Sequence, residues 1–139
     1  MTNPFVEVDK LENRLILVAE DNESLRELML MQLVFLGYAA ESAEDGVVAL
    51  SLWRKGHHAL LLTDCNMPNM DGFELTAAIR REEQEGTSLP IIAVTASAMQ
   101  GECLNRGMDG YLSKPYQLHE LKAMLTTWMP SHNHTFNLG

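Results

Sequence analysis

Four short apolar runs in this 139-residue sequence end in polar side chains of complementary chemistry. These side chains are Glu20, Asp21, Asp64, Thr95 and Lys114. Three carboxylates in one place raise one another's pKa and destabilise the fold unless a cation lies between them. Mg²⁺ is suited to such a place, because it prefers oxygen ligands, accepts one or two carboxylates and keeps positions for water and phosphate. If the side chains converge, they form a site for such an ion.

The same side chains include the parts of an electrostatic clamp for a phosphoryl group. Lys114 carries a mobile point charge suited to one phosphoryl oxygen, and the Thr95 hydroxyl can donate to another. One carboxylate can then act as a nucleophile and carry an aspartyl phosphate. Each residue alone also has an ordinary structural role: an acid at a helix N-terminus, a cap hydroxyl or a surface lysine. Their joint occurrence favours the phosphoryl site.

The elements that must position these residues alternate between strand and helix. Runs typical of buried parallel strands occupy residues 15–19, 59–63, 90–95 and 110–113, with a weaker candidate at 39–42. Helices are predicted at residues 24–36, 47–54, 73–82, 98–106 and 118–128. This alternation predicts a parallel sheet with helices on both faces. Ligands of such open sheets bind beyond the carboxyl ends of the strands, where the polar side chains occur.

Length, composition and charge define the class of protein. A chain of 139 residues with 46% hydrophobic residues is long enough for one domain with an ordinary core. Lys and Arg number 10 against 19 Asp and Glu, and the net charge of −9 argues against nucleic acid or anionic lipid as a partner. Two cysteines, no recognisable signal peptide and only short apolar runs predict a cytoplasmic domain without membrane contact. We expect residues 1–13 to be a tail or linker, 14–129 the domain and 130–139 a flexible tail.

Four motifs resemble those of one known family. They are LVAEDN (17–22), LTDCNMPNMDG (62–72), AVTA (93–96) and GMDGYLSKP (107–115). In their order and spacing they resemble the receiver domains of two-component response regulators and hybrid sensor histidine kinases, and the hybrid kinases most of all. The resemblance implies an α/β, flavodoxin-like (βα)5 fold: a three-layer sandwich around a five-stranded parallel sheet of order 2-1-3-4-5.

The resemblance also implies roles in metal binding and phosphoryl transfer. Asp64 is the phosphoacceptor, and Lys114 pairs first with Asp64 and then with the phosphoryl group. Asp21 binds Mg²⁺ directly, with Mn²⁺ as a substitute, and Glu20 holds the ion largely through water. The backbone carbonyl of Asn66 is a further ligand. Glu20 stands where many members have Asp, a variant that is familiar in hybrid kinases.

Further roles concern the response to phosphorylation. By resemblance, Thr95 is the switch hydroxyl, Tyr111 is the aromatic switch that rotates inward with it, and Lys114–Pro115 is a cis peptide bond. The family takes its phosphoryl group from a phosphohistidine and then controls a partner or passes the group on. By itself such a domain is not an enzyme, since it catalyses only its own phosphorylation and dephosphorylation.

The helix predicted at residues 24–36 has more apolar side chains than its core face needs. We assign Leu25, Leu28, Met29 and Leu36 to the core, whereas Leu30, Met31, Val34 and Phe35 fall elsewhere. The second set is either covered by a neighbouring segment, such as the N-terminal tail, or forms a docking face. In the family this helix receives the phosphodonor, so we predict contact with a histidine kinase dimerisation and phosphotransfer domain or an Hpt domain. The receiver itself is expected to be monomeric.

Two other functions remain to be weighed. A phosphohydrolase of the haloacid-dehalogenase-like class needs an acid two residues after its nucleophile, where this chain has Asn66. A receiver that acts only as a phosphorylation-independent binding module usually lacks an acid or the lysine, and this chain has them all. The sequence leaves open whether the domain stands alone or is the cytoplasmic part of a membrane-anchored hybrid kinase.

The cysteines and the histidine pair receive structural interpretations. We predict that Cys65 is a buried or semi-buried thiol, because its direction along the chain is opposite to that of its neighbours. Cys103 lies in no motif. We predict that His57 and His58 lie on a surface loop, since adjacent residues do not converge on one metal ion.

Overall fold

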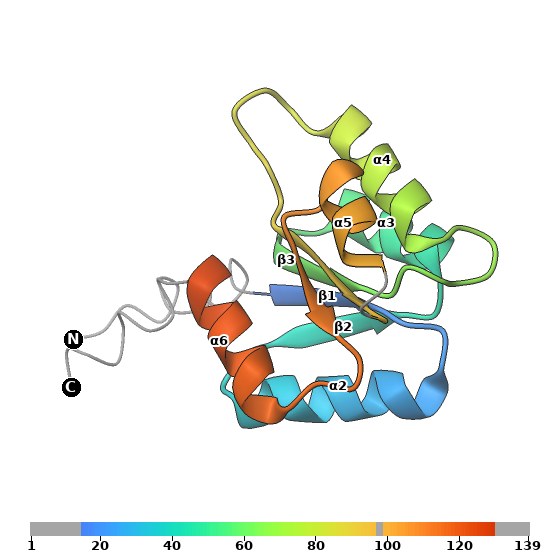
Figure 1. Ribbon diagram of the computed structural model, residues 1–139. Helices are drawn as coiled ribbons and strands as arrows, with labels where there is room; N and C mark the ends of the chain where they lie inside the picture. Colours follow the sequence, from blue (N-terminus) through green and yellow to red (C-terminus); the bar gives the residue numbers. More distant parts are fainter. Residues whose placement is uncertain (1–14, 97–98, 130–139) are drawn as a thin grey trace, which may run out of the picture.

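The computed structural model describes residues 15–96 and 99–129, where strands and helices alternate along the chain (Figure 1). The strands are β1 (Leu15–Ala19), β2 (Ala40–Ala43), β3 (His58–Thr63), β4 (Ile91–Thr95) and β5 (Gly110–Ser113). The helices are α2 (Glu23–Phe35), α3 (Gly46–Lys55), α4 (Gly72–Glu82), α5 (Gln100–Asn105) and α6 (Leu118–Trp128). Each predicted element is present with small differences at its ends. The predicted tails at residues 1–13 and 130–139 lie outside the described residues.

The five strands form one parallel sheet in the order β2-β1-β3-β4-β5, which confirms the predicted topology. Every residue of the inner strand β4 is buried. In the edge strand β5 only Leu112 is buried. This gradient follows from helices that cover both faces of a parallel sheet, so that inner strands are enclosed more completely than edge strands. The peptide bond between Lys114 and Pro115, directly after β5, is cis, as the resemblance implied.

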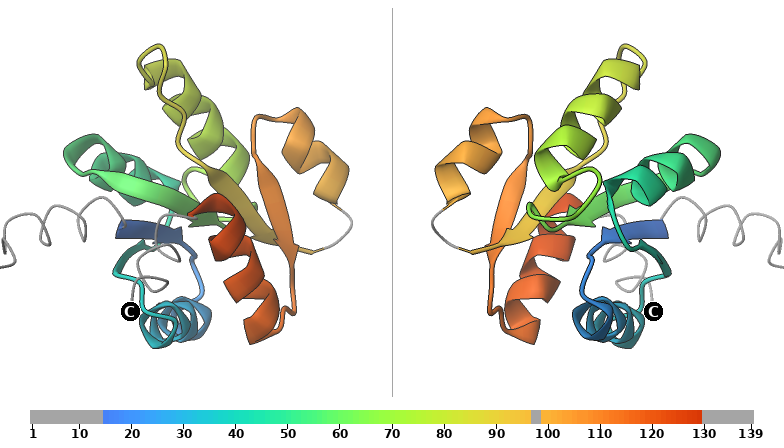
Figure 2. Two further views of the ribbon diagram at one scale, coloured as in Figure 1. Left: turned by 90° about the vertical axis from the view of Figure 1, so that its left-hand side faces the viewer. Right: turned by 90° about the vertical axis from the view of Figure 1, so that its right-hand side faces the viewer.

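Helices on both faces of the sheet make three layers (Figure 2). α2 and α6 pack on one face, and α3, α4 and α5 pack on the other. Because successive side chains of a strand point to opposite faces, each apolar run is divided between two cores. In β1, Leu17 and Ala19 join the core under α3, α4 and α5, whereas Ile16 and Val18 join the core under α2 and α6.

The buried side of α2 differs from the prediction. Met29 and Leu33 are buried, whereas Leu25 and Leu28 are 40% and 47% exposed, so the assignment of these two leucines to the core is wrong. The physical reason is a cavity of about 350 Å³ between α2 and the residues that follow β5, which Leu25 and Leu28 line. Leu36 is half-buried against the core, as predicted.

One histidine prediction is also wrong. His57 is exposed, but His58 begins β3 and its side chain is fully buried. Its Nε2 lies 2.6 Å from Oε1 of Glu41 on β2. The register of the three neighbouring strands brings this pair together, and adjacency in the sequence gives no sign of it.

Asp45, a buried carboxylate, caps the N-terminus of α3. It accepts hydrogen bonds from the Val48 N–H and the Asn69 amide, and these bonds hold the pKa of Asp45 below its ordinary value of 3.8.

Replacing Asp45 by alanine is expected to lower the free energy of unfolding by about 1 kcal/mol at neutral pH. Because the folded pKa is lowered, the carboxylate stabilises the fold above the unfolded pKa and ceases to do so as the pH falls through the folded value. Urea denaturation of the wild type and of Asp45→Ala should show that the difference between their free energies of unfolding narrows as the pH falls below 3.8. A difference independent of pH would contradict this account.

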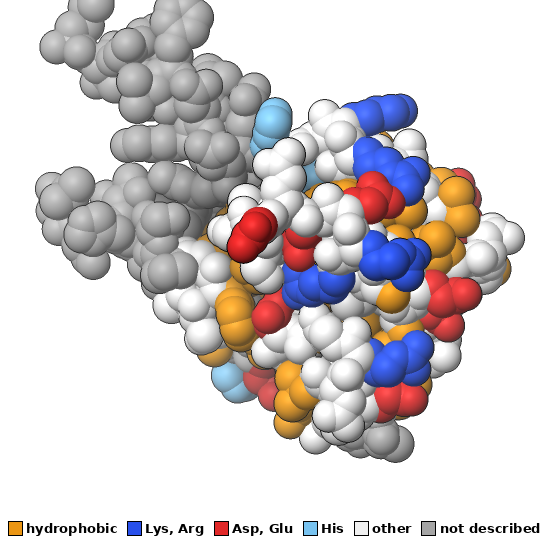
Figure 3. Space-filling view, turned by 90° about the horizontal axis from the view of Figure 1, so that it is seen from above, with side chains coloured by type: hydrophobic (Ala, Val, Ile, Leu, Met, Phe, Trp, Pro, Cys, Tyr) orange, Lys and Arg blue, Asp and Glu red, His pale blue; other side chains and the backbone are white. Residues whose placement is uncertain are grey.

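Ion pairs cover the side of the molecule formed by α3, α4 and α5. Arg54 pairs with Glu82 and joins α3 to α4, and Arg80 pairs with Asp109 in the turn before β5. Figure 3, which looks down on this side, shows basic side chains next to acidic ones.

Within residues 15–96 and 99–129, no helix has the length and apolar character needed to cross a bilayer.

Candidate functional site

The carboxyl ends of β1, β3 and β5 bring the predicted charged residues together. Nζ of Lys114 lies 2.9 Å from Oε1 of Glu20 and 3.5 Å from Oδ2 of Asp64. One carboxylate oxygen from each of Glu20, Asp21 and Asp64 lies within 4.8 Å of the others. The convergence that the sequence predicted is therefore present in the fold.

Backbone hydrogen bonds beyond the strand ends hold these residues in place. The N–H of Glu20 donates to the carbonyl of Ala43 at 3.1 Å, and the N–H of Asp64 donates to Ala19 at 2.9 Å. The N–H of Lys114 donates to the carbonyl of Thr95 at 2.8 Å. Because the parallel register continues past the strands, each functional side chain starts from a fixed backbone position.

The three acids lie at different depths. Glu20 is 1% exposed and accepts hydrogen bonds from the Lys114 ammonium and the N–H of Asn22. Asp64 is half-buried and Asp21 is exposed. Arg26 on α2 donates to the carbonyl of Glu20 at 2.8 Å and so ties the acidic segment to the helix. Sequence reasoning missed Arg26, since one basic residue on a helix is most often a solvated surface residue.

The charges of the site do not balance within the protein. Burial alone lowers the pKa of the Lys114 ammonium, but the hydrogen bond to Glu20 and the charge of Asp64 outweigh that effect and raise the pKa. Lys114 is therefore a cation at neutral pH. Three carboxylates against the Lys114 ammonium and the Arg26 guanidinium still leave an excess of negative charge on oxygen ligands, which fits a hard divalent cation.

The predicted switch residues lie on β4 and β5, the two strands beyond β3 in the sheet. Thr95 is buried, and its hydroxyl donates to the sulfur of Met99 at 3.7 Å, just before α5. The side-chain amide of Asn66 contacts the same sulfur at 4.0 Å, and the N–H of Asn66 donates to Oδ1 of Asp64 at 3.2 Å. Tyr111, half-buried on β5, packs against the core under α3, α4 and α5. Met99 was missed because nothing in the sequence marks a methionine before a short helix.

Cys65 is fully buried next to Asp64, as predicted for a structural thiol. Burial and the neighbouring Cys103 raise its pKa to about 12. Cys65 is therefore a protonated thiol at neutral pH while it is packed in the core. The neighbouring Cys103 lies on α5 and is fully buried as well.

Gly72 allows the close approach of α4 to the Asp64 backbone. A Cβ at Gly72 would lie 2.2 Å from the carbonyl oxygen of Asp64, a contact that forces the backbone to move. We expect Gly72→Ala to lower the free energy of unfolding by about 1–3 kcal/mol, as overpacking typically does. In α5, a Cβ at Gly101 would meet nothing within 4 Å, so Gly101→Ala should leave stability unchanged or raise it. Chemical denaturation of both variants tests the contrast, and equal effects would refute it.

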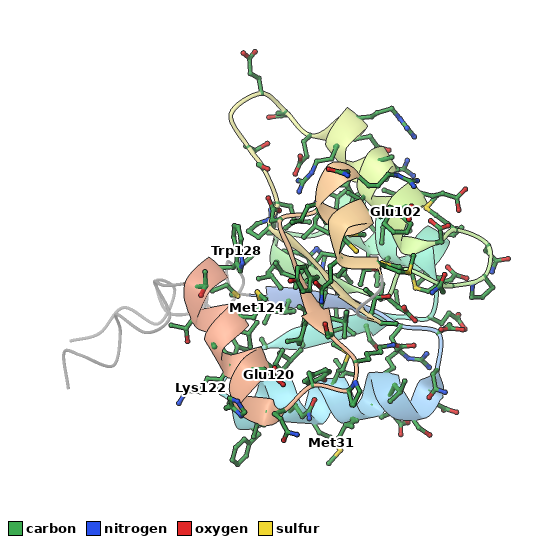
Figure 4. The ribbon with its side chains drawn as sticks, in the orientation of Figure 1. Met31, Glu102, Glu120, Lys122, Met124 and Trp128 are labelled. Carbon is green, nitrogen blue, oxygen red and sulfur yellow. The ribbon has the colours of Figure 1, made fainter. Side chains whose placement is uncertain are left out.

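The exposed apolar side chains of α2 form a surface that continues to the acidic cluster. We call the residues Leu25, Leu28, Met31, Val34 and Phe35 the α2 apolar face. Met31, Val34 and Phe35 are 68%, 67% and 76% exposed, and Met31 points away from the sheet (Figure 4). The fourth predicted docking residue, Leu30, is half-buried against the core. At its other end, the face lines the cavity that Glu20 and Lys114 also border.

Comparison with known proteins gives concordant matches. A family model for the response regulator receiver domain matches residues 16–126. The sensor histidine kinase RcsC of Escherichia coli K12 is 46% identical over 120 residues, which make up 84% of this chain and 12% of RcsC. The chain therefore spans only a small part of the length of such relatives.

Two solved structures share the fold. The receiver domain of the sensor histidine kinase PA1611 from Pseudomonas aeruginosa PAO1, with a magnesium ion in its active-site cleft, is 36% identical with a TM-score of 0.76. The match covers 83% of this chain and 96% of that one. The receiver domain of Ssk1 from Saccharomyces cerevisiae, in complex with the phosphotransfer protein Ypd1, is 26% identical with a TM-score of 0.75. That match covers 83% of this chain and 88% of the other.

Proposed function

Because the chain belongs to the response regulator receiver family, we propose that it accepts a phosphoryl group from a phosphohistidine onto Asp64. One observation carries the proposal: Glu20, Asp21 and Asp64 converge within 4.8 Å, with the Lys114 ammonium beside them. This set combines a nucleophile, oxygen ligands for a divalent cation and a cation for a phosphoryl oxygen. The domain then switches conformation, to control a partner or to pass the phosphoryl group on.

Asp64 is the nucleophile of the proposed transfer. One of its carboxylate oxygens attacks phosphorus, the bond from phosphorus to the donor's imidazole nitrogen breaks, and that nitrogen takes a proton. The N–H of Asn66 and the ammonium of Lys114 orient the two oxygens of the carboxylate from 3.2 and 3.5 Å. As the charge on Asp64 is lost, Lys114 is free to pair with a phosphoryl oxygen.

A divalent cation completes the proposed site. The residues that would hold it are Glu20, Asp21, Asp64 and the backbone carbonyl of Asn66. Mg²⁺, or Mn²⁺ as its substitute, supplies positive charge against the phosphoryl oxygens when bound. The PA1611 receiver domain, 36% identical, holds magnesium in its active-site cleft and supports this assignment. As an isolated domain, the chain is proposed to catalyse only its own phosphorylation and dephosphorylation.

The switch is proposed to start at Thr95. Its hydroxyl is now engaged by the sulfur of Met99, a weak acceptor. A phosphoryl group on Asp64 offers stronger acceptor oxygens, so Thr95 turns toward it and Tyr111 rotates inward. Both movements change the surface at α5 and β5. The release of Met99 by Thr95 couples the site to the start of α5.

The proposed phosphodonor is a histidine kinase dimerisation and phosphotransfer domain or an Hpt domain, which docks on the α2 apolar face of a monomeric receiver. The complex of the Ssk1 receiver with Ypd1 supports a partner of this kind. We propose that the receiver spans residues 14–129, with a linker at 1–13 and a tail at 130–139. We also propose that the parent chain is a hybrid histidine kinase with this domain on its cytoplasmic side. The sensor histidine kinase RcsC supports a parent of this kind, because its 120 matching residues are only 12% of its length.

Intact mass spectrometry tests the proposed function. The wild-type chain, incubated with Mg²⁺ and phosphoramidate or acetyl phosphate, should gain one phosphoryl group of about 80 Da. Chelation of the metal by EDTA should prevent the gain. Folded protein that binds Mg²⁺ but gains no mass from either these compounds or a phosphorylated Hpt domain would instead indicate a phosphorylation-independent binding module.

A further inference from the structure

Two buried thiols face each other beneath the phosphoacceptor loop. The sulfurs of Cys65 and Cys103 lie 3.7 Å apart, and both residues are fully buried. Cys65 lies between β3 and α4, and Cys103 lies on α5, 38 positions further along the chain. Both belong to the core under α3, α4 and α5. The proposed phosphoryl chemistry uses neither sulfur.

The separation of the sulfurs is short enough for a covalent link with little movement of the chain. A disulfide needs an S–S distance of about 2.05 Å, so the sulfurs must approach by roughly 1.6 Å. We expect rotation of the two side chains and a small shift of α5 to supply this movement. Since the cysteines lie on separate elements, the link would fasten α5 to the residue that follows Asp64.

α5 is also the element that can admit an oxidant. It has six residues, and Met99 at its N-cap position gives no side-chain hydrogen bond to the helix. Short helices without such a cap open locally more readily than long ones. On the same face of the sheet, α4 has eleven residues and a complete capping box (Figure 2). We expect the thiols to be protected while α5 is packed and to be exposed when α5 opens.

We propose that Cys65 and Cys103 are a modification site, at which a low-molecular-weight disulfide oxidises the two thiols to a reversible intramolecular disulfide. One cysteine sulfur attacks the small disulfide, breaks its S–S bond and releases one small thiol. The second cysteine then attacks the mixed disulfide and releases the other small thiol. The protein loses two hydrogens, and the small disulfide is reduced to two thiols.

The link also has a consequence for switching, which rests on the proposed function. Thr95 holds the residue just before α5 through the sulfur of Met99. A disulfide from Cys103 to Cys65 fastens the same helix at a second point. Fastened twice, α5 resists the movement that accompanies phosphorylation of Asp64. We therefore expect the oxidised protein to accept a phosphoryl group more slowly.

Intact mass after exposure to oxidised glutathione tests the modification. The wild-type monomer should lose about 2 Da and then take up no N-ethylmaleimide after denaturation. In Cys103→Ala and in Cys65→Ala, the one remaining cysteine should be either a free thiol or a mixed disulfide with glutathione. Dithiothreitol should restore the mass of the reduced wild type. Two maleimide groups on the treated wild type, or disulfide-linked dimers in place of the monomer, would overturn the proposal. Two single variants are used so that one still gives a result if the other does not fold.

The rate of phosphorylation tests the consequence. With phosphoramidate and Mg²⁺, the oxidised wild type should react about fivefold more slowly than the reduced protein, and dithiothreitol should reverse the loss. The double variant Cys65→Ala with Cys103→Ala, which has no thiol to oxidise, should react at one rate before and after the oxidant. Equal rates for oxidised and reduced wild type would overturn the coupling. Failure of the reduced protein to react would instead count against the proposed function. The loss of about 2 Da on oxidation does not depend on phosphorylation, so it tests the modification even in that case.

Discussion

The substitution Asp64→Asn is expected to abolish the gain of about 80 Da that the wild-type chain shows with Mg²⁺ and phosphoramidate. An amide oxygen is a poor nucleophile and does not carry a stable acyl phosphate, so the expected loss is complete. The fold should persist, because the backbone N–H of Asp64 is bonded to Ala19 and this bond does not involve the side chain. Intact mass spectrometry gives the result directly, and thermal unfolding shows whether the variant is folded.

A matched control removes a carboxylate of no proposed function. Glu85 is exposed in the turn after α4, and Glu85→Gln should gain the phosphoryl group at the wild-type rate. Removal of a charge in general is thereby separated from removal of the nucleophile. A gain of mass in Asp64→Asn would mean that another residue is the acceptor. The convergence of Glu20, Asp21 and Lys114 would then need a different chemical explanation.

The positions of the charged site residues could be predicted because they depend on rules of sheet topology. An acid after a buried strand has one place to go in an open parallel sheet, at the carboxyl edge of that strand. Asp64 after β3 and Lys114 after β5 meet there although 50 positions separate their numbers, 64 and 114. The alternation of strand and helix fixed the direction of every strand, and with it the edge at which the ends gather.

Contacts that depend on neighbouring elements could not be predicted. A helical wheel shows that Leu25, Leu28 and Met29 lie close together, but it does not show where the next segment ends. The residues after β5 leave a cavity beside α2, so the buried arc is centred on Met29 and Leu33. The exposed leucines belong to the α2 apolar face.

Side-chain pairs across the fold were hidden for the same reason. His58 meets Glu41 through strand register, Thr95 meets Met99 through the path into α5, and Cys65 meets Cys103 across two elements. None of these pairs has a characteristic spacing in the sequence. Strand ends follow general rules, whereas such pairs depend on the packing of particular elements.

The double substitution Met31→Lys with Phe35→Lys is expected to slow phosphoryl transfer from a protein donor at least about tenfold. The two side chains are one helical turn apart on α2 and are 68% and 76% exposed, so a docked helix would bury both. Two ammonium groups in an apolar contact must be desolvated without partners, which weakens docking. The reaction with phosphoramidate should keep its rate, because a small donor needs no docking face.

Quenched time courses with a phosphorylated histidine phosphotransfer (Hpt) domain measure this effect. A panel of such domains that includes Ypd1 is tested first, and the fastest donor to the wild type is used. Val47→Lys is the matched control, since Val47 is a 50% exposed apolar residue on α3, on the opposite face of the sheet. It should leave both reactions unchanged. Because all three substituted side chains are mostly or half exposed, their effect on stability should stay within about 0.5 kcal/mol. Equal slowing with the protein donor and with phosphoramidate would exclude docking as the cause and would point to a disturbance of the acidic site itself.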